Sequence, residues 1–303
     1  MELRHIRYFV AVAEELHFTR AAERLGIKQP PLSQQISRLE AEVGTLLFRR
    51  LKRSVELTDS GALLLHEARK ILEHIERAKT TIQRRARGET GRLVIGFAGA
   101  ANLQPLVPSI VRAYREKYPD LQMMPEQSNS PRLIADLRQG AIDVAFVRPP
   151  LEHASGIEVA PLIVEPMVVV LPSSHSLARA RSVSLSQLAH DTFLIWPRAI
   201  GPGPYDAVIA SCRRAGFFPR VLEDASQLAA IPPMVEAGFG ISIVPQSLER
   251  ISVHHVAYKP IEGEAPRAEI ALAYRTRETS PAVRNFVALA RRKKQQSAAA
   301  RAG

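Results

Sequence analysis

The sequence predicts a mixed α/β protein with an all-α N-terminal domain, one long helix and a larger α/β region. Three patterns predict this fold class. Apolar residues recur at helical spacing up to residue 43, and at strict three- and four-residue intervals from 61 to 82. Beyond residue 92, short apolar runs alternate with amphipathic stretches, as in α/β domains. We therefore divide the 303 residues into 1–58, 59–91 and 92–303.

A first helix is expected over residues 2–15, and residues 17–42 are typical of two further helices joined by a tight turn. Thr19 is the expected cap of the second helix, and Gly26 ends it because glycine adopts a positive φ at little cost. A proline pair opens the third helix, where a missing N–H costs nothing. Four residues at 4-3-4 spacing predict the buried stripe of that helix: Leu32, Ile36, Leu39 and Val43.

The opposite side of the third helix carries short hydrogen-bonding side chains and one cation. Its members are Gln29, Ser33, Gln34, Ser37 and Arg38. Such side chains suit base edges and phosphates, so the pattern predicts a helix-turn-helix whose last helix enters the major groove. An ordinary helical hairpin with a solvated polar face is the alternative.

Residues 47–57 predict a short β-hairpin. Leu47 and Phe48 are expected in the core, and four cations crowd the following segment: Arg49, Arg50, Lys52 and Arg53. Cations this close repel one another unless phosphate neutralises them, so the hairpin is expected to act as a wing on the DNA backbone or in the minor groove. A solvated loop is the alternative.

A long helix is expected from Thr58, with an apolar seam at 3-4 spacing that begins at Gly61. Such a seam is typical of a coiled coil, so we expect a dimerisation helix. The residues expected at the dimer contact are Leu64, Ala68, Ile71, Ile75, Ala78 and Ile82. A stripe of this kind can also pack within one chain.

The α/β region is predicted to form two subdomains. Alternating strands and helices over 92–147 give a βαβαβ series, whose ligands bind at the carboxyl ends of the strands. A second unit starts with the strand at 166–171, and the segments 268–275 and 281–294 return to the first. Subdomain I is therefore 92–163 with 267–303, and subdomain II is 164–266. Two chain crossings of this kind make a hinged clamp around a small molecule.

The net charge of +11 is concentrated at the two ends of the chain. Residues 1–91 hold 17 Lys/Arg against 12 Asp/Glu, and the tail 291–303 holds five Lys/Arg and no acid. A basic N-terminal unit on a nearly neutral body suits a nucleic-acid-binding domain attached to a sensor. The N-terminus lacks the features of a signal peptide, and no apolar run approaches membrane-spanning length. We expect a cytoplasmic protein with no membrane partner.

The sequence offers no catalytic or metal-binding constellation. It lacks G-x-x-x-x-G-K-[ST], H-E-x-x-H and G-x-S-x-G motifs, and His254 and His255 point to opposite faces of an expected strand. The single cysteine, Cys212, is expected to be a packing thiol. We therefore expect no enzyme, no cofactor and no metal site.

By its motifs the chain resembles the LysR-type transcriptional regulators of bacteria. The N-terminal residues that carry the resemblance are Phe18-Thr19-Arg20-Ala21-Ala22, Gln29-Pro30-Pro31-Leu32-Ser33-Gln34-Gln35-Ile36 and Leu47-Phe48-Arg49-Arg50. Asp143-Val144-Ala145 and Gly238-Phe239-Gly240-Ile241 to Pro245 support it in the α/β region. Gly96-Phe97 and residues 197–206 look most like the branch that governs aromatic-compound catabolism.

The resemblance implies a winged helix-turn-helix dimer or tetramer that binds double-stranded promoter DNA. It also implies a periplasmic-binding-protein-like effector domain and action on RNA polymerase. The DNA-binding residues expected on this basis, together with the polar helix face, are Phe18, Thr19, Lys28, Gln29, Pro30, Ser33, Gln34, Ser37, Arg38, Arg50 and Arg53. The family often has a basic residue where Gln34 stands.

The resemblance places the effector between the two subdomains. The expected contacts are Gly99, Ala100, Asn129, Ser130, Arg148, Pro202, Gly203, Tyr205 and Gln227. One cation and a helix start suit a carboxylate, so an aromatic or dicarboxylic acid is expected. For Arg148 a salt bridge between subdomains is the alternative. A solute-binding protein of a transport system is the alternative function, and it leaves residues 1–90 unexplained.

Overall fold

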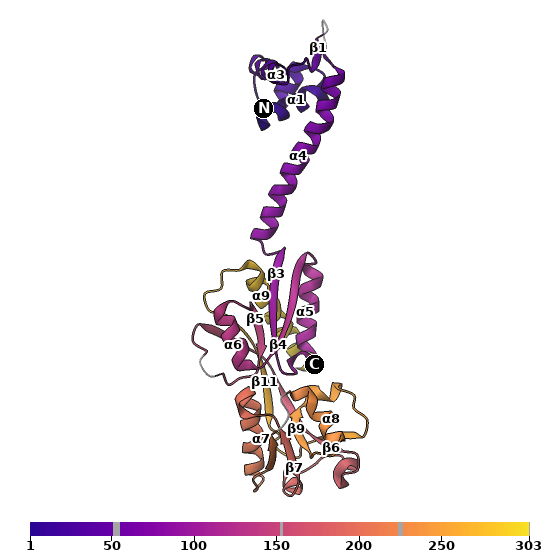
Figure 1. The fold of residues 1–303 in the computed structure, drawn as a ribbon, viewed down its shortest axis with the longest axis vertical. Coiled ribbons are helices and arrows are strands. Elements are labelled where there is room, and N and C mark those ends of the chain that lie inside the picture. Colours follow the sequence, from indigo (N-terminus) through magenta and orange to yellow (C-terminus); the bar gives the residue numbers. More distant parts are fainter. Residues whose placement is uncertain (51–54, 152–153, 224–226, 303) are drawn as a thin grey trace. The chain divides into compact units, whose positions relative to one another are not determined.

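The computed structural model describes residues 1–303 except 51–54, 152–153, 224–226 and 303. The chain forms two compact units, Met1–Arg84 and Arg85–Gly303 (Figure 1). Each unit has hydrophobic cores of its own.

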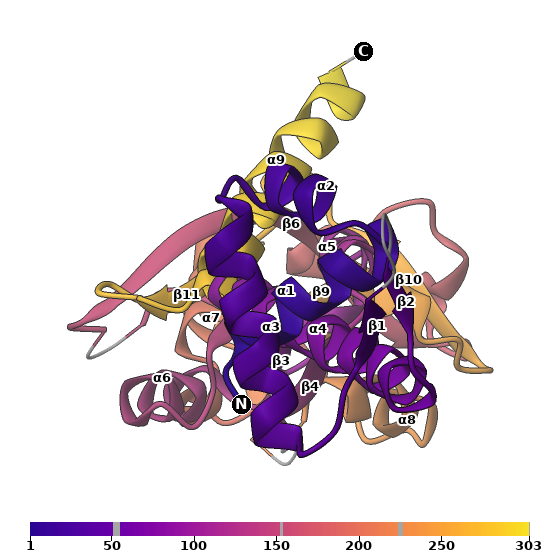
Figure 2. The same ribbon diagram turned by 90° about the horizontal axis from the view of Figure 1, so that it is seen from above.

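The first unit is a winged helix-turn-helix. Its elements are α1 (Leu3–Glu15), α2 (Phe18–Leu25), α3 (Gln29–Val43), β1 (Phe48–Arg50), β2 (Val55–Leu57) and most of α4 (Asp59–Ala86). Figure 2 shows α1, α2 and α3 gathered into one bundle, and the three helices pack on one another. β1 and β2 form the predicted antiparallel hairpin.

Two local predictions for this unit were wrong. The N-cap of α2 is His17, whose ring nitrogen accepts a hydrogen bond from the Arg20 N–H, and Thr19 lies inside the helix. Leu32, Ile36 and Leu39 are fully buried as predicted, whereas Val43 is 43% exposed because it is the last residue of α3, one turn beyond the core. Gly26 does end α2 in the left-handed region, with φ of +68°.

The N-terminal part of α4 belongs to the core of the first unit. A Cβ atom on Gly61 would lie 2.1 Å from the carbonyl oxygen of Leu47, so only glycine permits this close approach. Ala68 is fully buried against the same core, and Leu64 is half-buried there. The assignment of Ala68 to a dimer contact is therefore corrected, because its side chain already packs within its own chain.

The second unit is built on one mixed sheet of order β10-β6-β11-β5-β3-β4, with β9 paired to β6. Its strands are β3 (Gly91–Ala98), β4 (Leu121–Ser128), β5 (Val144–Val147), β6 (Ile157–Pro172), β9 (Ser242–Pro245), β10 (Val256–Pro260) and β11 (Arg267–Arg275). β3 runs parallel to β4 and β5, while β11 is antiparallel to β5 and β6. The long strand β6 pairs with β11 in its first part and with β9 and β10 in its second, so it crosses between the two subdomains.

Helices cover both faces of the sheet in subdomain I. α5 (Leu106–Lys117) and α9 (Pro281–Ala302) share one core, and α6 (Ser130–Gln139) packs on the opposite face. In subdomain II the parallel pair β7 (Thr192–Ile195) and β8 (Arg220–Glu223) joins α7 (Pro202–Arg214) and α8 (Ile231–Glu236) around a separate core. No described helix has the length and apolar character needed to cross a membrane.

Candidate functional site

The polar face of α3 is exposed. Gln29, Pro30, Gln34, Ser37 and Arg38 are all open to solvent, and Ser33 is half-buried. An exposed row of amide and hydroxyl groups with one cation can contact base edges and phosphates together. Thr19 and Lys28 are exposed at the starts of α2 and α3, where they flank this row.

Two aromatic rings connect α2 to the wing. Phe18 is half-buried and packs edge-on against Phe48, with 6.0 Å between the ring centroids. The predicted DNA contact Phe18 therefore supports β1 through its ring. Of the predicted wing contacts, Arg53 lies outside the described residues, and only the backbone of Arg50 is described, in β1.

A further hydrogen bond orients α3 and was missed in the sequence. The buried ring of His5 accepts from the Glu2 N–H through Nδ1 at 3.3 Å, so its Nε2 carries the proton. That Nε2 donates to Gln35 Oε1 at 2.8 Å. The start of α1 is thereby fixed to the recognition helix.

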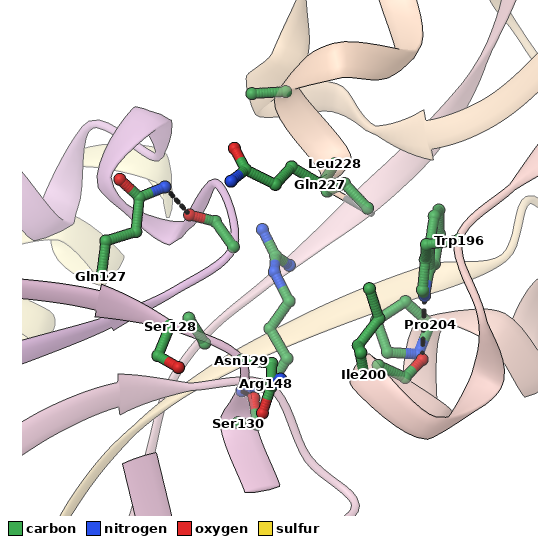
Figure 3. A pocket seen from close by; sticks show the side chains of 14 residues that line it. Gln127, Ser128, Asn129, Ser130, Arg148, Trp196, Ile200, Pro204, Gln227 and Leu228 are labelled. Atoms are coloured by element: carbon green, nitrogen blue, oxygen red, sulfur yellow. Dashed lines mark hydrogen bonds between the residues drawn. The ribbon is translucent and has the colours of Figure 1, made fainter. Parts of the chain in front are cut away.

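The second unit holds a cavity of about 310 Å³ where the two subdomains meet (Figure 3). Five of the predicted effector contacts line it: Gly99, Asn129, Ser130, Arg148 and Gln227. The first four follow the carboxyl ends of β3, β4 and β5, as expected for a parallel sheet. Gln227 comes from subdomain II, just before the short 3₁₀ helix Leu228–Ala230.

Four predicted contacts do not line this cavity. Ala100 is buried in the core that surrounds Leu228, and half-buried Tyr205 packs against that same core. A Cβ atom on Gly203 would lie 2.1 Å from the Pro149 carbonyl oxygen, so Gly203 serves close packing between subdomains. Pro202 lines a separate crevice. The physical reason is that α7 already begins at Pro202, which turns Pro204 and not Tyr205 toward the cavity.

Several lining residues were missed in the sequence. They are Ala98, Gln127, Ser128, Trp196, Ile200, Gly201, Pro204, Leu228 and Ala229. Gln127 and Ser128 end β4, so the strand-end rule could have found them. Trp196, the only tryptophan of the chain, directly follows β7 and forms an apolar wall together with Ile200 and Leu228 (Figure 3).

Arg148 stands at the centre of the cavity and is 5% exposed. Its backbone N–H donates to Ser130 Oγ at 3.0 Å, and its Nη2 donates to Glu165 Oε1 at 3.3 Å. Nε and Nη1 have no hydrogen-bond partner among the described residues. Burial lowers the pKa of the guanidinium, and Glu165 opposes that shift. A guanidinium is not deprotonated in proteins, so the group stays charged.

The walls around Arg148 are fixed by local hydrogen bonds. Asn129 caps α6, since its Oδ1 accepts from the Arg132 N–H at 2.9 Å. Gln127 Nε2 donates to the Gly99 carbonyl at 3.2 Å, and Trp196 Nε1 donates to the Gly201 carbonyl at 3.0 Å (Figure 3). The N-terminus of α6 and the buried guanidinium both favour negative charge, so the two together can stabilise an anion.

An exposed helix-turn-helix face together with a two-subdomain clamp defines a ligand-responsive regulator that binds promoter DNA. Residues 3–62 match the family described as bacterial regulatory helix-turn-helix protein, lysR family, and residues 86–295 match the LysR substrate binding domain. The chain belongs to the LysR family of bacterial transcriptional regulators. This family is not enzymatic, and the solute-binding alternative is not favoured.

Relatives and solved structures agree over nearly the whole chain. The chain is 40% identical over 287 residues to the regulator BudR of Raoultella terrigena, covering 95% of this chain and 99% of BudR. It is 40% identical over 288 residues to AlsR of Bacillus subtilis (strain 168), covering 95% and 94%. Among structures, CbnR complexed with its target DNA has a TM-score of 0.80 at 31% identity, covering 97% of this chain and 100% of CbnR.

Proposed function

We propose that the effector is a small monocarboxylic acid whose carboxylate binds Arg148 at the N-terminus of α6. The observation that carries this proposal is the buried guanidinium, whose Nε and Nη1 atoms meet no hydrogen-bond partner among the described residues. Buried donors without acceptors cost free energy, about 1–3 kcal/mol for a neutral group and more for a charged one. A carboxylate bound there supplies the missing acceptors.

One carboxylate fits this cavity better than two. Arg148 is the only charged residue among the described residues that line it. The opposite wall is apolar, with Trp196, Ile200, Pro204 and Leu228. A second carboxylate on that side would lose its hydration without a cation to replace it. Gln127 and Gln227 offer neutral polar contacts, which suit a hydroxyl or carbonyl substituent.

Trp196 provides a direct test, because the only tryptophan of the chain lies in the cavity wall. We expect acetate, butanoate or benzoate to change its fluorescence in a saturable way. The corresponding amides should bind at least tenfold more weakly, and succinate should not bind more tightly than butanoate. N-acetyltryptophanamide controls for direct quenching. Equal titration by acids and amides would contradict the proposal.

We further propose that the protein acts on transcription as a homotetramer that contacts RNA polymerase. Exposed apolar residues on α4, namely Ile71 and Ile82, support self-association of the first unit, with Ile75 and Ala78 on the same stripe. Membership of the aromatic-catabolism branch stays a prediction, which the benzoate titration also tests. In vitro transcription from the DNA upstream of the gene for this protein distinguishes activation from repression, when the transcript level is compared with and without the acid that binds best.

A further inference from the structure

One buried carboxylate connects Arg148 to both subdomains. Glu165 lies on β6, the strand that crosses between them, and is 6% exposed. Its Oε1 accepts from Arg148 Nη2 at 3.3 Å and from Ser247 Oγ at 3.1 Å, and its Oε2 accepts from the Ser247 N–H at 2.9 Å. Arg148 follows β5 in subdomain I, whereas Ser247 follows β9 in subdomain II. Ser247 therefore fixes the position of Glu165, and Glu165 fixes that of Arg148.

Glu165 uses only part of the binding capacity of Arg148. A guanidinium has five N–H bonds, and the three on Nε and Nη1 meet no acceptor among the described residues. An anion in the cavity thus reaches the same cation from another side. Two carboxylates on one guanidinium lie only about 6–8 Å apart, and in a buried site their repulsion is screened far less than in water.

We propose that Glu165 is a positioning residue that competes with the effector carboxylate for the charge of Arg148. This inference rests on the proposed monocarboxylate effector. Glu165 holds the guanidinium in place before the effector arrives, and its own charge lowers the affinity of the site for anions. It therefore sets the effector concentration at which the regulator responds. The competition acts on charged ligands and leaves neutral analogues of the same shape unaffected.

The test compares carboxylate and amide ligands in the full-length protein. In E165Q the competing charge is gone while a hydrogen-bonding amide remains, so we expect benzoate to bind roughly tenfold to a hundredfold more tightly. Benzamide should bind about as in the wild type. E158Q is the matched control, because Glu158 lies on the same strand and its side chain contacts Arg291, outside the cavity. It should leave both affinities unchanged.

The ratio of benzoate to benzamide affinity separates the outcomes. If the role of Glu165 were purely structural, E165Q would change the benzoate and benzamide affinities by the same factor. An unchanged ratio in E165Q would therefore contradict the proposed competition. If E165Q does not fold, E165D retains the charge but withdraws it from Arg148, and the ratio should rise above the wild-type value. An E165D ratio equal to that of the wild type overturns the proposal. Wild-type protein that binds no carboxylate refutes the proposed function itself.

Discussion

Replacement of Ser130 by alanine removes one oxygen atom at the point where α6 meets the cavity. Ser130 is 3% exposed, and its Oγ accepts the backbone N–H of Arg148 at 3.0 Å. The hydroxyl proton meets no acceptor among the described residues, so it is free to donate to an effector carboxylate. The substitution therefore perturbs the fold and the site at once, and the two effects can be measured separately.

The magnitudes follow from the two hydrogen bonds. Leaving the buried Arg148 N–H without an acceptor costs about 1–3 kcal/mol of folding free energy. For a domain of this size each kcal/mol lowers the melting temperature by about 2–4 °C. Losing a hydroxyl that donates to a charged carboxylate costs a further 1.5–3 kcal/mol or so of binding. The effector Kd should accordingly rise roughly 10- to 100-fold.

Three assays follow the variant: thermal unfolding, titration of Trp196 fluorescence, and gel shift without effector. We expect a lower melting temperature, a weaker titration and unchanged DNA affinity. Ser242→Ala is the matched control, because the buried Ser242 Oγ donates to the Leu194 carbonyl at 2.7 Å outside the cavity. It should destabilise the domain and leave the Kd unchanged. An effector Kd for Ser130→Ala within twofold of the wild type would remove Ser130 from the site.

Three further outcomes are expected. The double variant Ile71→Glu with Ile75→Glu should sediment as a folded monomer. Ala68→Glu should instead unfold the first unit, because that position is fully buried. Persistent dimers of the double variant would show that α4 is not the dimer contact. Arg38→Ala should weaken DNA binding evenly across sequences and reduce the slope of log K against log salt by about one, and an unchanged slope would exclude a phosphate contact. Burial raises the pKa of Cys212 to about 11, so its thiol should resist alkylation at pH 8.5 until the protein unfolds. The stability of the fold should also decrease as the pH rises above the ordinary thiol pKa of about 8.5. Fast alkylation of the native protein would contradict this.

The order of helices and strands could be predicted from the sequence because each element carries its own periodicity. Cap positions could not be predicted, since several residues compete for them. Thr19 is a good cap residue, but the cap of α2 is His17, so the helix starts two residues earlier than a Thr19 cap requires. Leu228–Ala230 form a 3₁₀ turn, and α8 begins only at Ile231. The proline pair 232–233 fits the first turn of α8 and not the interior of one continuous helix.

The seam on α4 shows why periodicity alone does not identify a partner. Gly61 and Ala68 share the repeat with Ile71 and Ile82, yet the first two are buried in the same chain while the last two are 38% and 69% exposed. An apolar stripe indicates that one face of a helix is covered. The surface that covers it can differ from one part of the helix to another. Only the position of the core, which ends near residue 72, distinguishes the two halves.

In the cavity, the residues at the ends of strands were predictable and those set by helix starts were not. Asn129, Ser130 and Arg148, which the resemblance implied, lie directly after β4 and β5, where ligands of a parallel sheet bind. Which side chain of α7 faces the ligand depends on the residue at which that helix begins. A shift of one residue turns a helical side chain by about 100°, which exchanges Pro204 for Tyr205.

For Arg148 the sequence allowed two alternatives, a carboxylate contact or a salt bridge between subdomains. The geometry is compatible with both at the same time. A salt bridge that used the whole guanidinium would leave nothing for a ligand, but the contact to Glu165 is a single 3.3 Å hydrogen bond from Nη2. Breaking that buried pair would be costly, so the bridge keeps the cation in place. Its Nε and Nη1, which meet no acceptor in the described part of the chain, then keep it able to bind an anion. Arg148 can bind a ligand because its contact with Glu165 leaves other N–H donors of the guanidinium available.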